Sequence, residues 1–109
     1  MAIPHANSGQ PIDVRPLGAE LSKARTVALF KTGDVEVIRM VLPAGKSMPL
    51  HKVAGDITKK CIEGKIEITA EDQSQTLQAD QLMYLSGGIL HSLLGLQDAS
   101  ALLTIVLRK

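Results

Sequence analysis

The sequence has few aromatic residues and a single cysteine, and both shortages limit what the protein can do. Phe30 and Tyr84 are the only aromatics among 109 residues, so the chain lacks the stacked rings on which single-stranded nucleic acids bind. Cys61 stands alone, which excludes an internal disulfide. We expect an aliphatic core in which Cys61 is a small buried hydrophobe and in which Met48, Met83 and Tyr84 serve packing.

Long apolar runs are also missing. No stretch approaches the roughly 20 residues of a membrane-spanning helix, and the N-terminus has neither the basic start nor the apolar core of a secretory signal. We expect a cytoplasmic protein that does not bind membranes. The net charge is +1, with cations spread among acids, and this pattern indicates no nucleic-acid partner.

The length of 109 residues is that of one domain. Three prolines interrupt residues 1–24, and we expect an extended N-terminal arm there, with one short helical turn at 17–22. Residues 25–109 are expected to form the barrel domain.

Apolar residues recur with a period of two from Arg25 onward, which predicts an all-β fold. Turn residues roughly every eight to twelve positions separate about eight or nine short strands, as is typical of a barrel or a sandwich. The expected strands cover residues 26–31, 35–42, 57–62, 65–69, 76–78, 82–85, 91–94 and 101–107, and a further strand begins at His51. The first two strands form a hairpin, and Glu63-Gly64 turns a second hairpin between 57–62 and 65–69.

The last expected strand is apolar on both faces. Leu103 and Ile105 alternate with Leu102 and Val106 along it. A strand of this kind is covered on both sides, and in a one-domain protein another subunit can provide the second cover. We therefore expect a homodimer.

Two histidines follow glycine-rich turns, one in each half of the expected domain. His51 comes shortly after Pro43-Ala44-Gly45, and His91 follows Ser86-Gly87-Gly88. In a small β-barrel, this arrangement predicts that both imidazoles point into one pocket.

The segment around His51 resembles the first of two sequence motifs of the cupin superfamily, which consists of small β-barrels. Gly45, His51 and Gly64 match that motif at its spacing. Val53 stands where the motif has its second histidine, and Ile57 stands where it has a glutamate.

The second cupin motif is matched less fully. Gly88 and His91 agree with it, whereas Asp80, Ser86 and Gly95 replace its first glycine, its proline and its asparagine. The resemblance extends from about Val35 to Leu107. It implies a double-stranded β-helix, or jelly-roll, barrel.

The resemblance also bears on metal binding, because cupins that bind metal typically use three histidines and a glutamate. This chain supplies only His51 and His91 at those positions, which is an incomplete set for a divalent ion such as iron, zinc, manganese or nickel. Asp56 is a weak third candidate, since it points to the opposite face unless a β-bulge re-aims it. We expect a metal site that is weak or absent.

Lys59 shares the parity of Ile57, and the register of the family places it inside the barrel. Periodicity alone does not choose between Lys59 and Lys60 for the inner face. If Lys59 faces inward, its ammonium stands where relatives keep a metal. The expected ligand pocket is then lined by His51, His91, Lys59, Val53 and Ile57.

Three functions are open at this point. The leading hypothesis is a barrel that binds a small molecule in its central pocket, an anion if Lys59 faces inward. The alternative is a metal-dependent enzyme of the oxygenase or isomerase type that uses His51 and His91, so the sequence leaves open whether the protein is an enzyme. The third is a sensory or interaction module, because related barrels sense ligands in transcription regulators. In a purely structural interpretation, both histidines only stabilise the fold.

Overall fold

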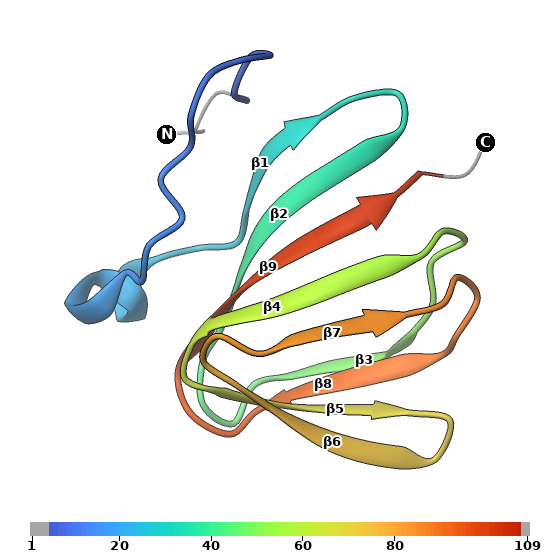
Figure 1. Ribbon diagram of the computed structural model, residues 1–109. Helices are drawn as coiled ribbons and strands as arrows, with labels where there is room; N and C mark the ends of the chain where they lie inside the picture. The colour runs from blue at the N-terminus through green and yellow to red at the C-terminus, as the bar shows by residue number, and fades with distance from the viewer. Residues whose placement is uncertain (1–4, 108–109) are drawn as a thin grey trace.

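A computed structural model describes residues 5–107, and nine β-strands make up most of that part of the chain (Figure 1). The strands are β1 Val27–Lys31, β2 Val35–Leu42, β3 Ser47–His51, β4 Ile57–Glu63, β5 Lys65–Ala70, β6 Gln73–Gln78, β7 Leu82–Leu85, β8 His91–Gly95 and β9 Ala99–Val106. A short 3-10 helix, η1 (Gly18–Lys23), precedes them and confirms the helical turn predicted near this position. The boundary between arm and barrel at residue 24 stays a prediction, and residues 1–4 of the predicted arm lie outside the described part.

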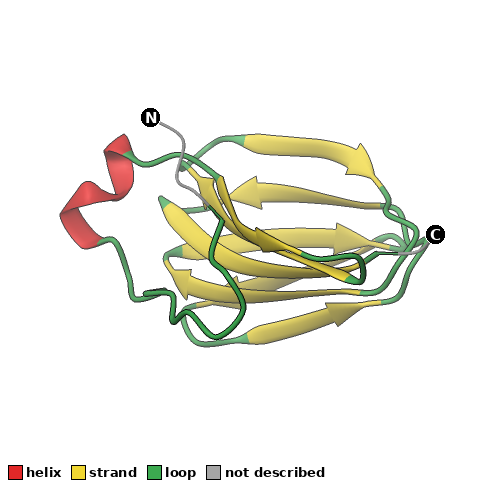
Figure 2. Ribbon diagram, turned by 90° about the horizontal axis from the view of Figure 1, so that it is seen from above, coloured by secondary structure: helices red, strands yellow, loops and turns green. Residues whose placement is uncertain are grey.

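The strands form two antiparallel sheets that face each other. One sheet has the order β1-β2-β9-β4-β7, and the other has the order β3-β8-β5-β6. Figure 1 shows the two layers, and in Figure 2 the short helix lies beyond one end of the strands. The predicted all-β class is therefore confirmed. Within residues 5–107, no helical segment has the length and the apolar character to cross a membrane, and the cytoplasmic location stays a prediction.

The predicted hairpin between β1 and β2 is confirmed. Thr32 organises its turn, because its hydroxyl oxygen accepts hydrogen bonds from the backbone N–H groups of Asp34 (3.0 Å) and Val35 (3.1 Å). A threonine hydroxyl that satisfies nearby backbone donors favours a turn over continued strand.

The predicted second hairpin is wrong. Gly64 joins β4 to β5, but β4 pairs with β7 and β9, whereas β5 pairs with β6 and β8 in the other sheet. Gly64 has a φ of +81° and forms a corner at which the chain changes sheet. A side chain there would place its Cβ 2.1 Å from the carbonyl oxygen of Asp98. Glycine is thus required both by the backbone angle and by the close approach of residue 98.

The prediction that a strand begins at His51 is also wrong. β3 already begins at Ser47, and His51 is its last residue. Pro49 lies inside this strand, which is tolerated because β3 is at the edge of its sheet, where a missing N–H is not needed for pairing. The pairing of β3 with β8 also shifts its register between Met48 and His51.

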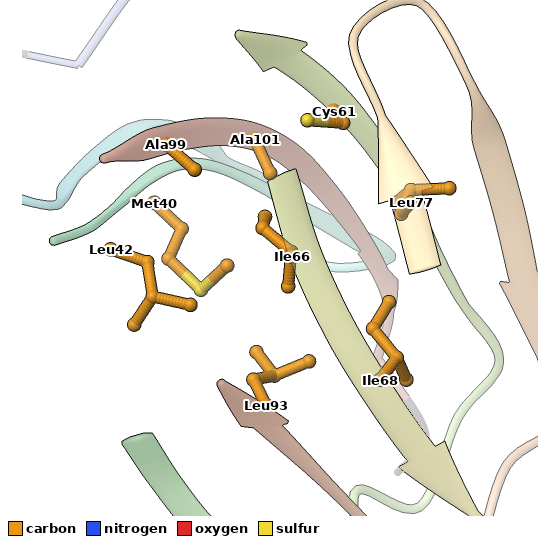
Figure 3. Packing of buried hydrophobic residues seen from close by; sticks show 9 residues of the cluster. All are labelled: Met40, Leu42, Cys61, Ile66, Ile68, Leu77, Leu93, Ala99 and Ala101. Atoms are coloured by element: carbon orange, nitrogen blue, oxygen red, sulfur yellow. The ribbon is translucent and has the colours of Figure 1, made fainter. Parts of the chain in front are cut away.

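Aliphatic side chains from both sheets pack between the layers (Figure 3). The buried cluster consists of Met40, Leu42, Cys61, Ile66, Ile68, Leu77, Leu93, Ala99 and Ala101. Figure 3 shows Met40 and Leu42 of the first sheet facing Ile66 and Leu93 of the second. The predicted aliphatic core is confirmed.

Of the four residues predicted to serve packing, three do so. Cys61 is a fully buried free thiol whose pKa is raised by burial, and Met48 and Met83 pack against the core cluster. The prediction for Tyr84 is wrong, because this side chain is 61% exposed and its hydroxyl shares a hydrogen bond with the Ser86 hydroxyl (2.9 Å). The alternation along β7 turns Tyr84 to the outer face of its sheet.

Glu63, at the end of β4, anchors the segment that precedes β1. Its carboxylate accepts hydrogen bonds from the backbone N–H groups of Leu17 (2.9 Å) and Gly18 (3.0 Å), and from the hydroxyl of Ser100. Partial burial alone would raise the pKa of Glu63, but these hydrogen bonds hold it below its usual value. One carboxylate thus fixes the start of η1 to the barrel.

The outer face of β9 is only partly covered in this chain. Leu102 and Thr104 are half-buried there, and Val106 is exposed. The homodimer stays a prediction.

We expect Gly64→Ala to lower the free energy of unfolding by about 3 kcal/mol or more, because a left-handed φ costs about 1–2 kcal/mol and the clash with Asp98 adds to it. Gly45→Ala is the matched control, since Gly45 has the same φ of +81° but nothing within 4 Å of the added Cβ. It should lose only about 1–2 kcal/mol, the cost of the left-handed φ alone. Urea unfolding of both variants measures the difference, and equal losses would contradict a tight corner at Gly64.

Candidate functional site

The fold brings the two histidines together. His51 ends β3 and His91 begins β8, and their Cα atoms are paired across the two neighbouring strands. The imidazole rings lie with their centroids 4.3 Å apart at an angle of 55°. Chain segments forty residues apart therefore meet at one point of the second sheet.

Each histidine donates its Nδ1 proton to a nearby backbone carbonyl. The Nδ1 of His51 lies 2.9 Å from the oxygen of Pro49, and the Nδ1 of His91 lies 3.0 Å from the oxygen of Ile89. A carbonyl can only accept, so these contacts assign the proton of each neutral ring to Nδ1. A lone pair is then left on Nε2 of both rings.

His91 is the more deeply placed of the two, with an exposed fraction of 1%. Its Nε2 is buried and has no hydrogen-bond partner among the described residues. Burial lowers the pKa of His91, and the charges of Lys59 and His51 act in the same direction, against the hydrogen bond to Ile89 that raises it. His91 is therefore a neutral imidazole near pH 7, with an unused acceptor inside the protein.

Lys59 lies on the inner face of β4, and its side chain is 2% exposed. Its neighbours across the strands are both apolar, Met83 on β7 and Leu103 on β9. Burial in these surroundings lowers the pKa of Lys59 to about 8, and within residues 5–107 no carboxylate forms an ion pair with it. The inner position belongs to Lys59 and the exposed one to Lys60, as the family register implied.

Ile57, also predicted for the pocket, is buried at the start of β4, two residues before Lys59 and on the same face of the strand. Val53 is half-buried, and its carbonyl accepts a hydrogen bond from the N–H of Gly88 (2.8 Å). The carboxylate of Asp56 accepts one from the N–H of Gly87 (2.8 Å). Both contacts tie the loop before β4 to the turn before His91, so these two residues support the position of that histidine.

The donor atoms present do not fit the metal centre that the resemblance implies. Among residues 5–107, no three His, Cys, Asp or Glu side chains are grouped so that they could hold an ion. His51 and His91 offer two nitrogen atoms, and Asp56 is engaged at the turn. The charge of Lys59 acts on His91 and would also oppose a cation there.

A cavity of about 330 Å³ opens where β2, the loop that follows it and β3 meet. Its walls are mainly apolar and include Ile38, Met40, Met48 and Leu103, with Lys46 at the surface. Leu103 is the cross-strand neighbour of Lys59, so the cavity reaches the residue beside the buried ammonium.

Sequence reasoning missed the apolar wall of this cavity. Ile38 and Met40 share the inner face of β2, and Leu103 shares that of β9. The period of two along both strands contained this signal, but the cupin motifs cover neither strand, and the pocket was predicted from the motifs alone.

No protein-family model matches the sequence, and no curated protein matches it either. Solved structures, in contrast, are similar in fold. A conserved protein of unknown function from Streptococcus pyogenes is 19% identical with a TM-score of 0.76, over 100% of this chain and 96% of that one. A cupin superfamily protein from Desulfitobacterium hafniense has the same identity and TM-score, over 89% of this chain and 94% of that one.

A third similar structure is an RmlC-like cupin with a double-stranded β-helix fold from Methanocaldococcus jannaschii. It is 18% identical with a TM-score of 0.72, over 92% of this chain and 93% of that one. The two facing antiparallel sheets thus define a double-stranded β-helix barrel. The chain has the cupin fold, and the resemblance seen in the motifs is confirmed at the level of the fold.

We expect Lys59→Met to raise the free energy of unfolding at pH 7 by about 3–3.5 kcal/mol. A pKa lowered from 10.5 to about 8 means that the folded protein binds this proton less tightly than the unfolded chain, at about 1.4 kcal/mol per unit. The penalty in the wild type is complete below pH 8 and disappears as the pH rises to about 10.5. The gain of the variant should shrink over that interval.

Urea unfolding between pH 7 and 10.5 measures this gain. Lys60→Met is the matched control, because Lys60 is the next residue of β4 and is exposed. Its stability should differ little from that of the wild type at any of these pH values. The same pH dependence in both variants would show that Lys59 is not buried as a charge.

Proposed function

We propose that the barrel binds a small aliphatic hydroxycarboxylate beside Lys59, His91 and His51. The observation that carries this proposal is an ammonium group, 2% exposed, without a carboxylate partner within the described residues. A buried charge is costly unless it is paired and hydrogen-bonded. A ligand carboxylate supplies the missing pair.

The charges of the side chains around the site favour an anionic ligand. Burial lowers the pKa of His91 and the charge of Lys59 adds to this effect, whereas no carboxylate among residues 5–107 contributes to the shift. Lys46 lines the surface end of the cavity, and none of the acidic side chains in the described part of the chain lines it. A negatively charged ligand meets Lys46 at the surface, and the cavity extends inward to Leu103, the cross-strand neighbour of Lys59.

The histidines favour a hydroxyl group on the same ligand. With Nδ1 of each ring donating to a carbonyl, Nε2 is an acceptor, and that of His91 is buried without a partner in residues 5–107. A hydroxyl donates one hydrogen bond to such an atom, whereas a bare carboxylate offers no donor at neutral pH. The leading ligand therefore carries its hydroxyl close to its carboxylate.

The walls of the cavity favour a short aliphatic chain. Ile38, Met48 and Leu103 contribute apolar surface, and within residues 5–107 no Phe, Tyr or Trp side chain lines the cavity. A volume of about 330 Å³ lies at the small end of ligand pockets, which span about 300–1,000 Å³.

Titration of the protein with 2-hydroxybutanoate and with butanoate, followed by NMR of the histidine Cε1–H signals, tests the proposal. We expect 2-hydroxybutanoate to shift both histidine signals and to bind more tightly than butanoate. Lys59→Met should lose at least about tenfold in affinity for both ligands, while Lys60→Met should bind like the wild type.

His91→Phe separates the two parts of the recognition. This variant lacks the Nε2 acceptor but keeps Lys59, so it should bind the two ligands with similar affinity. The proposal fails if neither ligand shifts the histidine signals at about 10 mM, where even millimolar binding would be seen, or if Lys59→Met leaves both affinities unchanged.

A further inference from the structure

A second cavity lies on the outer side of the five-stranded sheet. It has a volume of about 500 Å³ and is formed between the segment before β1 and the strands β1 and β2. Ile12, Leu17, Val27 and Leu29 give it apolar walls, and Arg39 lines it as well. In Figure 1, the segment before β1 runs alongside the β1 edge of the sheet.

Arg39 faces this cavity and not the barrel interior. It is paired with Leu102, whereas the adjacent residue Met40 is paired with Ala101 and belongs to the core. Successive side chains of a strand point to opposite faces. The sheet therefore separates Arg39 from Lys59, which lies on the inner face.

The guanidinium of Arg39 is buried, and one of its nitrogen atoms has no partner among the described residues. Its side chain is 7% exposed, and its Nη2 donates a hydrogen bond to the backbone oxygen of Asp13 (3.1 Å). Its Nε is buried with no partner among the described residues. A guanidinium presents five N–H donors, and the N–H on Nε of Arg39 is available to another group.

The nearest acids do not neutralise this charge. The charge of Arg39 acts on Asp13 and on Glu63, but both carboxylates bind other groups. Asp13 forms an ion pair with Arg15 (2.8 Å), and Glu63 accepts from Leu17 and from other donors of the barrel. Within residues 5–107, no carboxylate forms an ion pair with Arg39.

We propose that this outer cavity binds a linear aliphatic monocarboxylate, with its carboxylate on the guanidinium of Arg39 and its chain against the apolar walls. A guanidinium matches a carboxylate in shape as well as in charge, because two parallel N–H groups can each donate to one oxygen. The volume of about 500 Å³ is ordinary for a ligand pocket. No hydroxyl is required here, in contrast to the site beside His91.

Titration with octanoate and with octanol, followed by two-dimensional NMR of the backbone amides, tests this site. We expect octanoate to shift the amide signals of Ala24, Val27 and Leu29, which line the cavity, and octanol to shift them much less. Arg39→Gln should weaken octanoate binding at least tenfold. Lys59→Met should leave it within a factor of two, because this lysine lies on the other face of the sheet.

Ala24→Leu provides a variant that keeps Arg39 and its contacts but fills part of the cavity. It should weaken octanoate binding more than acetate binding. The proposal is overturned if octanoate shifts only the amide signals of His91 and Leu103, or if Arg39→Gln binds octanoate as the wild type does. It is also overturned if the amide signals of the cavity residues shift with protein concentration alone, which would show that a second copy of the chain covers the cavity. If the proposed hydroxycarboxylate site beside Lys59 proves wrong, the octanoate shifts expected at the amides of Ala24, Val27 and Leu29 would still be observed, so the two proposals can fail separately.

Discussion

The burial of the Lys59 ammonium between two apolar strand neighbours is the constraint on which the proposed binding site depends. Met83 and Leu103 flank Lys59 across the strands, and the polar groups near it in the second sheet are histidines, not carboxylates. Desolvation therefore acts on the lysine without compensation. A group retained at such a cost is a candidate for function, because the fold itself would be more stable with an apolar side chain there.

The two ends of the barrel interior differ in what they contain. Near the Gly64 corner, small residues such as Ala99 and Ala101 let the sheets approach, and aliphatic side chains fill the space between them. Lys59 lies four positions before the end of β4, away from that corner. One region of the interior thus supplies stability, and the other holds the buried ammonium of Lys59 and the buried Nε2 acceptor of His91.

The sequence predicted local structure better than it predicted which strands pair. The period of two identified the strands, but Glu63-Gly64 was interpreted as a hairpin turn because the pairing of β4 with β9 involves residues far away in the chain. The inner position of Lys59 followed from the cupin resemblance and not from periodicity, since Lys60 fitted equally well. The burial of Arg39 could not be foreseen, because it depends on where the segment before β1 folds back.

The most direct test is the pKa of Lys59, measured by NMR of the lysine side chains in the 109-residue protein, with and without saturating 2-hydroxybutanoate. We predict a value near 8 in the free protein and a rise towards or above the usual value of 10.5 when a carboxylate lies beside the ammonium. An ordinary pKa in the free protein, or a lowered one that the ligand leaves unchanged, would contradict this prediction.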